Sequence, residues 1–227
     1  MSKKIYLSPS NQYDNQYAYG NTSEMKVCNT FAKAAEIALK RCGFTVKRAP
    51  EGQAMSKSIS ESNSWGADLH IPIHTNAGGG NGTLVMVYSQ SSQNMALAKP
   101  IYNAVQAVTP GKIDYGIREY PQLAELNSTN AIAVYIEVDF HDNKEIAKWL
   151  INNSTTVGEA IAKGVCSGYG VKYVAPNSQN SSKPTSSSKT IYRVQVGAFS
   201  DKKNAENYLS KIKKAGFSDA FITEVKK

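Results

Sequence analysis

The stretch that decides the fold runs from residue 128 to residue 143 and reads STNAIAVYIEVDFHDN. Its apolar run, AIAVYI, is rich in β-branched residues and predicts a strand over residues 131–140 that is buried on both faces. Strands of this kind belong to parallel sheets covered by helices. The stretch therefore predicts an α/β fold.

Strand and helix patterns alternate on both sides of this stretch. We expect strands at 4–7, 67–74 and 82–88, and helices at 23–42, 94–108, 143–151 and 155–166. This alternation is typical of an α/β domain with a mostly parallel sheet and flanking helices, in which sites form beyond the carboxyl ends of the strands. Pro72 fits poorly in a central strand, so we expect an edge position or a bulge there.

Composition divides the 227 residues into two domains and a linker. Residues 175–189, APNSQNSSKPTSSSK, cannot form a core and predict a flexible linker after a first domain at 1–174. Residues 190–227 predict a small βαβ module, with strands at 191–199 and 220–225 around a helix at 202–215. Because one such unit scarcely covers one face of its own sheet, we expect it to pair with another element.

The net charge of +8 favours acidic partners: nucleic acid, anionic membranes or cell-wall polymers. No interleaved aromatic and basic motif supports nucleic acid, and no run is long enough to insert into a membrane. The three cysteines form no CxxC pair, so we expect thiols rather than a metal knuckle or a disulfide framework. The short apolar run near the N-terminus predicts synthesis in the cytoplasm without a signal peptide.

Two histidines lie in the predicted strand at 67–74. On a strand, His70 and His74 are about 13 Å apart, too far to touch one zinc ion at about 2 Å each. At most one of them is a ligand, and a lone histidine at a strand end is otherwise structural. The glycine-rich loop at 77–82 lacks the GK[ST] ending of a phosphate loop and predicts a mobile rim.

Three carboxylates are candidates for a catalytic or metal-binding role. Glu137 and Asp139 end the buried strand on one face, and a charge near a core is costly, which favours a catalytic or metal role. The pattern does not say which of the two reacts. Glu24 opens the helix at 23–42, and from the residues alone its interpretation is a capping box with Asn21.

These motifs occur in one order along residues 3–173. The most specific are YLSPSNQ at 6–12, GNTSE at 20–24, WGADLHIPIHTNAGGG at 65–80 and the stretch at 128–143. Together they resemble the zinc-dependent N-acetylmuramoyl-L-alanine amidase family of the third type, especially its clostridial phage endolysins.

The resemblance implies a zinc hydrolase. It makes Glu24 and His74 metal ligands and Glu137 the catalytic base, with Asn76 as a substrate contact. Relatives with this opening carry a histidine where SPSNQYDN places Asp14, which we therefore expect as the first ligand. An Asp/Glu/His set is more anionic than a His/Glu/His set, so the metal would be a weaker Lewis acid.

The resemblance also implies the substrate. The bond is the amide between the lactyl group of N-acetylmuramic acid and L-alanine, in the peptidoglycan of Gram-positive walls. The tail resembles half of a SPOR-type wall-binding domain, so we expect a homodimer through it. We predict a phage endolysin that acts on the wall after release. The alternative is a non-catalytic peptidoglycan-binding protein with a degenerate amidase fold, which has no need of a buried Glu137.

Overall fold

The strand predicted over residues 131–140 lies inside a seven-stranded sheet, as two pieces named β6 (Ile132–Ala133) and β7 (Tyr135–Phe140). The computed structural model describes residues 2–176, 196–217 and 220–223. The chain divides into two compact units, Met1–Asn180 and Ser181–Lys227.

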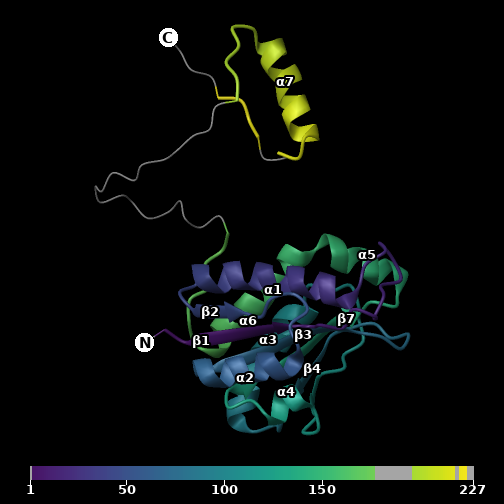
Figure 1. The fold of residues 1–227 in the computed structure, drawn as a ribbon, viewed down its shortest axis with the longest axis vertical. Coiled ribbons are helices and arrows are strands. Elements are labelled where there is room, and N and C mark those ends of the chain that lie inside the picture. The colour runs from purple at the N-terminus through teal and green to yellow at the C-terminus, as the bar shows by residue number, and fades with distance from the viewer. Residues whose placement is uncertain (1, 177–195, 218–219, 224–227) are drawn as a thin grey trace. The chain divides into compact units, whose positions relative to one another are not determined.

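The first unit alternates strands and helices as predicted (Figure 1). Besides β6 and β7, its elements in chain order are β1 (Lys4–Pro9), α1 (Glu24–Arg41), β2 (Thr45–Arg48), α2 (Met55–Trp65), β3 (Leu69–Asn76), β4 (Leu84–Val87), α3 (Ser92–Gln106), β5 (Ile117–Glu119), α4 (Ala124–Asn127), α5 (Lys144–Asn152) and α6 (Ser154–Gly168).

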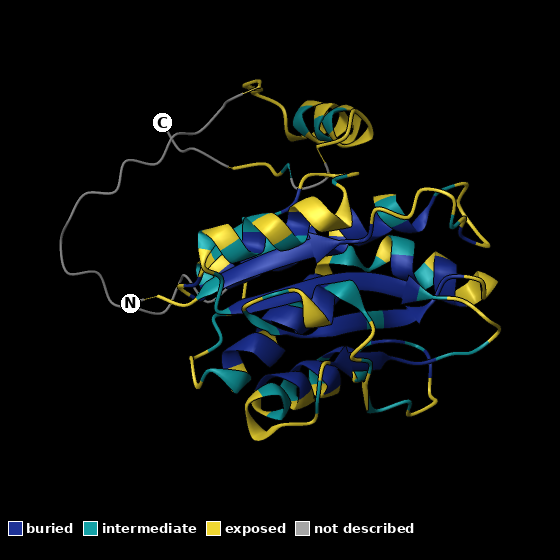
Figure 2. Cartoon of the chain, turned by 60° about the horizontal axis from the view of Figure 1, so that its bottom comes forward, coloured by how far each residue is buried: buried dark blue, intermediate teal, exposed yellow. Residues whose placement is uncertain are grey.

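The sheet has the strand order β2-β1-β3-β7-β4-β5, with β6 beside β3. All of its pairs are parallel except β4 with β7, which confirms the mostly parallel sheet with flanking helices. The strands form the buried interior of the unit, and the exposed residues lie on the outer faces of the helices and on loops (Figure 2).

The two faces of the sheet differ in chemistry. One face carries Leu7, Ile73 and Ile136 into a large apolar core shared with α1, α3 and α6. Because strand side chains alternate, His70 and His74 point to the other face. The apolar cluster on that face is small and includes Tyr135 and Leu126. Polar groups therefore concentrate on the second face, which α2 and α4 border.

Pro72 is not on an edge strand, because β3 pairs with β1 on one side and with β6 and β7 on the other. The expected bulge at Pro72 is also absent: the pairing register is the same at His70 with Ala133 as at Ile73 with Ile136. Proline lacks the N–H that would bond the neighbouring strand. The ladder is interrupted at this point instead, and β6 and β7 are separate pieces.

Four elements have no counterpart in the sequence-based prediction. The helix α2 buries two serines, Ser58 and Ser62, toward the protein, so it lacks the apolar period that marks a helix. The strand β2 is only partly buried, and β5 and α4 are three and four residues long. Such short elements are too brief for a period to be detected.

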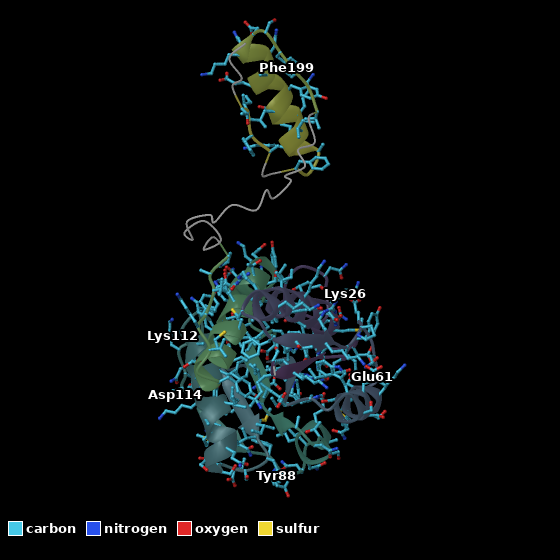
Figure 3. The ribbon with its side chains drawn as sticks, turned by 90° about the vertical axis from the view of Figure 1, so that its left-hand side faces the viewer. Lys26, Glu61, Tyr88, Lys112, Asp114 and Phe199 are labelled. Atoms are coloured by element: carbon cyan, nitrogen blue, oxygen red, sulfur yellow. The ribbon has the colours of Figure 1, made fainter. Side chains whose placement is uncertain are left out.

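In the second unit, α7 (Lys202–Lys214) confirms the predicted helix. The described parts of the two expected strands, 196–199 and 220–223, have no strand pairing, and their remaining residues lie outside the described residues, as does the expected linker from 177 to 189. Phe199 packs beside α7 with its ring 5.3 Å from that of Tyr208 (Figure 3). Within the described residues, no helix is long and apolar enough to cross a membrane.

Candidate functional site

The site lies near the carboxyl ends of β3 and β7 and the start of α1. These strands are parallel, and their register places His74 beside Glu137. The first residue of α1, Glu24, reaches the same place from the end of the loop that follows β1. Three of the five predicted site residues are therefore brought together by the sheet and one helix terminus.

Glu24 and His74 form a buried pair. The Nδ1 of His74 donates to Oε1 of Glu24 at 2.8 Å, and the two residues are 1% and 6% exposed. The backbone N–H of Thr75 donates to the same oxygen at 3.3 Å. The ring of His74 stacks on that of Tyr135, with centroids 4.5 Å apart.

The pKa values of this pair follow from burial and contact. Burial favours the neutral forms, but the hydrogen bond and charge of His74 outweigh it and lower the pKa of Glu24. The hydrogen bond that His74 donates to Glu24 and the charge of Glu137 likewise outweigh burial and raise the pKa of His74. Both groups thus favour their charged forms.

The capping-box interpretation of Glu24 is wrong. The residue that caps α1 is Ser23, no side chain makes a capping hydrogen bond there, and Asn21 lies in the left-handed region with φ 47°. The Glu24 carboxylate is instead directed to His74 and Asn15. The side chain serves the site rather than the helix terminus.

Glu137 has an oxygen without a partner. Its Oε2 is buried and makes no hydrogen bond to the described residues. Burial raises the pKa of Glu137 to about 7; the charge of His74 lowers it and that of Glu24 raises it. A carboxyl group with this pKa can both accept and donate a proton near neutral pH.

The loop at 10–15 covers the pair. Asn15 Nδ2 donates to Glu24 Oε2 at 2.7 Å and to Gln12 Oε1 at 2.6 Å, and Gln12 Nε2 lies 3.3 Å from His74 Nδ1. Asp14 is exposed in the same loop and is not brought to the pair. Asn15 and Gln12, which the sequence analysis did not select, make the contacts at this position.

The residues at this position match the ligands of a zinc site in part. Glu24 and His74 supply an oxygen and a nitrogen of the types that zinc prefers, converging on one point. Glu137 adds an unpaired buried carboxylate oxygen nearby. Within the described residues, however, no three His, Cys, Asp or Glu side chains are grouped closely enough to hold a metal ion. Two protein ligands fit, and the third is not in place.

The two remaining candidates have local contacts. Asp139 is fully buried and accepts hydrogen bonds from the backbone N–H groups of Gly82, Gly111 and Phe140, so it anchors two loops. Asn76 ends β3, and its Oδ1 accepts from the N–H of Ala77 at 2.8 Å. Its role as a substrate contact stays a prediction.

A second polar cluster lies on the same face of the sheet. The Oε1 of Glu125, in α4, accepts from Ser8 Oγ at 2.5 Å and lies 3.1 Å from His70 Nε2. Glu125 is 4% exposed and His70 is fully buried. The two histidines of β3 have different surroundings: His70 contacts Glu125, and His74 contacts Glu24. No sequence pattern marks Glu125, because it lies on a helix of four residues.

Comparison with known proteins identifies both parts of the chain. Residues 5–167 match the family model described as N-acetylmuramoyl-L-alanine amidase, and residues 172–226 match the model of the SPOR domain. The first match confirms the resemblance inferred from the motifs.

Two curated relatives are similar over the first unit. The amidase CwlM of Bacillus licheniformis is 28% identical over 169 residues, covering 74% of this chain, and the sporulation-specific N-acetylmuramoyl-L-alanine amidase of Bacillus subtilis is 27% identical over 174 residues, also covering 74%. The chain spans 62% of the length of each, which is less than two thirds.

Solved structures share the fold. The catalytic domain of the CD27L endolysin that targets Clostridia difficile is 26% identical with a TM-score of 0.60, covering 72% of this chain and 96% of that one. The catalytic domain of the amidase CwlV from Bacillus (Paenibacillus) polymyxa is 20% identical with a TM-score of 0.67, covering 75% of this chain and 99% of that one.

The raised pKa of Glu137 predicts a pH-dependent stability in the metal-free protein. The fold favours the protonated carboxyl, so ionisation costs stability once the pH exceeds the unfolded value of 4.5, and the full cost is reached above about 7. We expect Glu137→Gln to raise the free energy of unfolding by about 3 kcal/mol at pH 8 and by almost nothing at pH 4. Urea unfolding with a chelator present measures both values. An equal gain at the two pH values would contradict the assignment.

Proposed function

This chain belongs to the N-acetylmuramoyl-L-alanine amidase family, and from that membership we propose that it hydrolyses the amide between N-acetylmuramic acid and L-alanine in peptidoglycan. The observation that carries the proposal is Glu137, which pairs with His74 in the sheet and whose buried Oε2 has no hydrogen-bond partner among the described residues. A carboxylate in such a place costs stability, and a protein that only binds cell wall has no use for it.

Glu137 would move the proton of the reaction. With a pKa of about 7, it takes a proton from the attacking water and passes it to the leaving amine of L-alanine. The C–N bond breaks, and the products are a free lactyl carboxylate and a new amino terminus. The buried position of the carboxylate keeps bulk water from competing for that proton.

Zinc is the metal that we propose for this site. Glu24 and His74 would hold it, and Asp14 would complete the set by moving inward from its exposed position. Bound there, the metal would make the attacking water more acidic and polarise the amide carbonyl. Without the metal, Asn15 donates to Glu24 and to Gln12, so the Glu24 carboxylate stays oriented.

We further propose where the protein acts. The second unit, with its SPOR match and the basic α7, would bind the wall, while the first unit cuts it. The similarity to an endolysin catalytic domain supports a phage enzyme that is released onto Gram-positive walls. The similarity to a sporulation-specific amidase leaves a bacterial autolysin as the second candidate.

Replacing the proposed base and a proposed ligand should separate catalysis from metal binding. We expect Glu137→Gln to lower hydrolysis by roughly 10²–10⁴-fold while retaining zinc, because the base is lost and the ligands remain. His74→Ala should lose both zinc and hydrolysis. New amino-terminal alanine released from purified Gram-positive walls measures the reaction, and elemental analysis measures the metal.

The matched control is Glu51→Gln, an exposed carboxylate outside the site, which should keep the wild-type rate. Removing zinc with a chelator should abolish hydrolysis, and added zinc should restore it. Wild-type hydrolysis by Glu137→Gln would remove Glu137 as the base. A wild-type chain that holds no zinc and clears no walls would instead be the non-catalytic wall-binding alternative.

The first ligand has its own test. Loss of a residue that only supports a metal ligand already lowers the metal affinity, and loss of a direct ligand should lower it at least as much. We therefore expect Asp14→Ala to weaken zinc binding roughly tenfold or more. Asp14→His should bind zinc as well as or better than the wild type. Competition with a fluorescent chelator gives the affinities. Tyr13→Ala, a change in the exposed neighbour, should have no effect. Undiminished affinity in Asp14→Ala would mean that another residue is the first ligand.

The second unit predicts a homodimer. Its described residues expose Phe217 at 61% and Phe221 at 78%, and α7 buries none of its residues, so apolar surface is available to a second copy. We expect light scattering at micromolar concentration to give twice the mass of one chain. A variant that ends at residue 189 should give the mass of one chain. A one-chain mass for the full protein would contradict the proposal.

A further inference from the structure

A cavity of about 340 Å³ lies beside His74 and extends away from it toward α2 and α4. Ser8 and Ser10 of the first strand and loop line it, together with Ser58 of α2 and Glu125 of α4. This volume is at the low end for small-molecule sites, so the cavity accepts a short group rather than a polymer chain. Because His74 belongs to the same lining, whatever fills the cavity is continuous with the proposed reacting amide.

Glu125 gives this cavity a buried negative charge. Both of its hydrogen bonds from the described residues fall on Oε1, from Ser8 and from His70. The Nδ1 of His70 is buried without a hydrogen-bond partner among the described residues, so His70 contacts Glu125 through Nε2.

The lining of the cavity does not cancel the charge of Glu125. No lysine or arginine is among the described residues that line it. Glu24 and Glu137 are not in this lining, and His74, which is, is hydrogen-bonded to Glu24 rather than to Glu125. The charge of Glu125 therefore lacks a matching cation among the described residues of the lining, and a buried carboxylate of this kind attracts a positively charged group.

We propose that this cavity is a specificity subsite in which Glu125 binds a primary ammonium group of the substrate, the side-chain amine of the diamino acid in the stem peptide. This inference rests on the proposed amidase function. Glu125 does not touch the reacting atoms, so it acts on substrate affinity rather than on the chemical step.

The spacing along β3 fits this substrate. Glu125 is bonded to His70, four residues before His74, and to Ser8, whose partner on β3 is Pro72. The carboxylate is thus roughly 7–13 Å along the strand from His74. An extended peptide covers about 3.3–3.6 Å per residue, so the distance corresponds to roughly two to four residues beyond the scissile amide. The diamino acid is the third residue of a stem peptide.

The test compares two substrates with the full-length protein. One is N-acetylmuramoyl-L-alanyl-D-isoglutaminyl-L-lysine with a free side-chain amine, and the other is the same compound with that amine acetylated. We expect the kcat/KM of the wild type to be at least about tenfold higher for the substrate with the free amine, with the difference in KM rather than in kcat. Acetylation removes the positive charge, and the buried carboxylate then loses its partner. This comparison needs no variant.

Glu125→Gln should bring the ratio of the kcat/KM values for the two substrates close to one. Glutamine keeps an oxygen that accepts from Ser8 and His70, and a thermal unfolding curve checks that the fold is retained. Glu51→Gln, an exposed carboxylate outside the cavity, should keep the wild-type ratio. Equal kcat/KM values for both substrates in the wild type would overturn the proposal, as would a wild-type ratio in Glu125→Gln.

Binding to an inactive variant separates this proposal from the amidase proposal. Calorimetry with Glu137→Gln measures the affinity of L-alanyl-D-isoglutaminyl-L-lysine and of its acetylated form. Tighter binding of the peptide with the free amine supports the subsite if adding Glu125→Gln removes the difference in affinity. This holds even if the wild type cleaves neither substrate, and in that case only the amidase proposal fails. Equal binding of the two peptides overturns the subsite whatever the activity.

Discussion

The parallel pairing of β3 with β7 is the interaction on which the site depends. One register places Ile73 beside Ile136 on the core face and His74 beside Glu137 on the opposite face. A shift by one residue would exchange these faces, burying the charged pair in the apolar core and exposing the isoleucines. The hydrophobic effect that holds the strands in register therefore also positions the reactive side chains.

The polar face is electrostatically costly, and the rest of the unit stabilises it. Glu24, Glu125 and Glu137 are acidic side chains on or beside one face of the sheet, and only histidines lie against them as bases. Isolated, such groups would neutralise or draw in water. The large core on the other face, built from α1, α3 and α6, supplies the burial that offsets this cost. An excess of buried negative charge is what a metal ion and a cationic substrate group would each relieve.

Much of the fold was predictable because its central elements are periodic. The apolar spacing of Val27, Phe31 and Ala38 marks α1, and all three are buried. The double-sided apolar run marks β6 and β7. The same reasoning missed α2, whose buried positions are serines, and misjudged Pro72, because the ladder tolerates a gap in a central strand. A local sequence pattern indicates the environment that is typical for its residues. It does not show where a neighbouring segment makes an exception possible, as at α2 and Pro72.

By itself, the sequence determined the fold class, the family and three members of the site, Glu24, His74 and Glu137. Glu137 stands out as a charged residue within an apolar strand, whereas the family resemblance selected Glu24 and His74. Only the tertiary structure decided that Glu24 turns to His74 rather than capping its helix, that Asp139 anchors loops and that Glu125 lines a cavity beside the site. The physical reason is that a carboxylate takes its role from the groups around it. The partners that decide these roles include His74 for Glu24, Gly111 for Asp139 and Ser8 for Glu125. They lie 50, 28 and 117 positions away in the chain, and no local pattern records them.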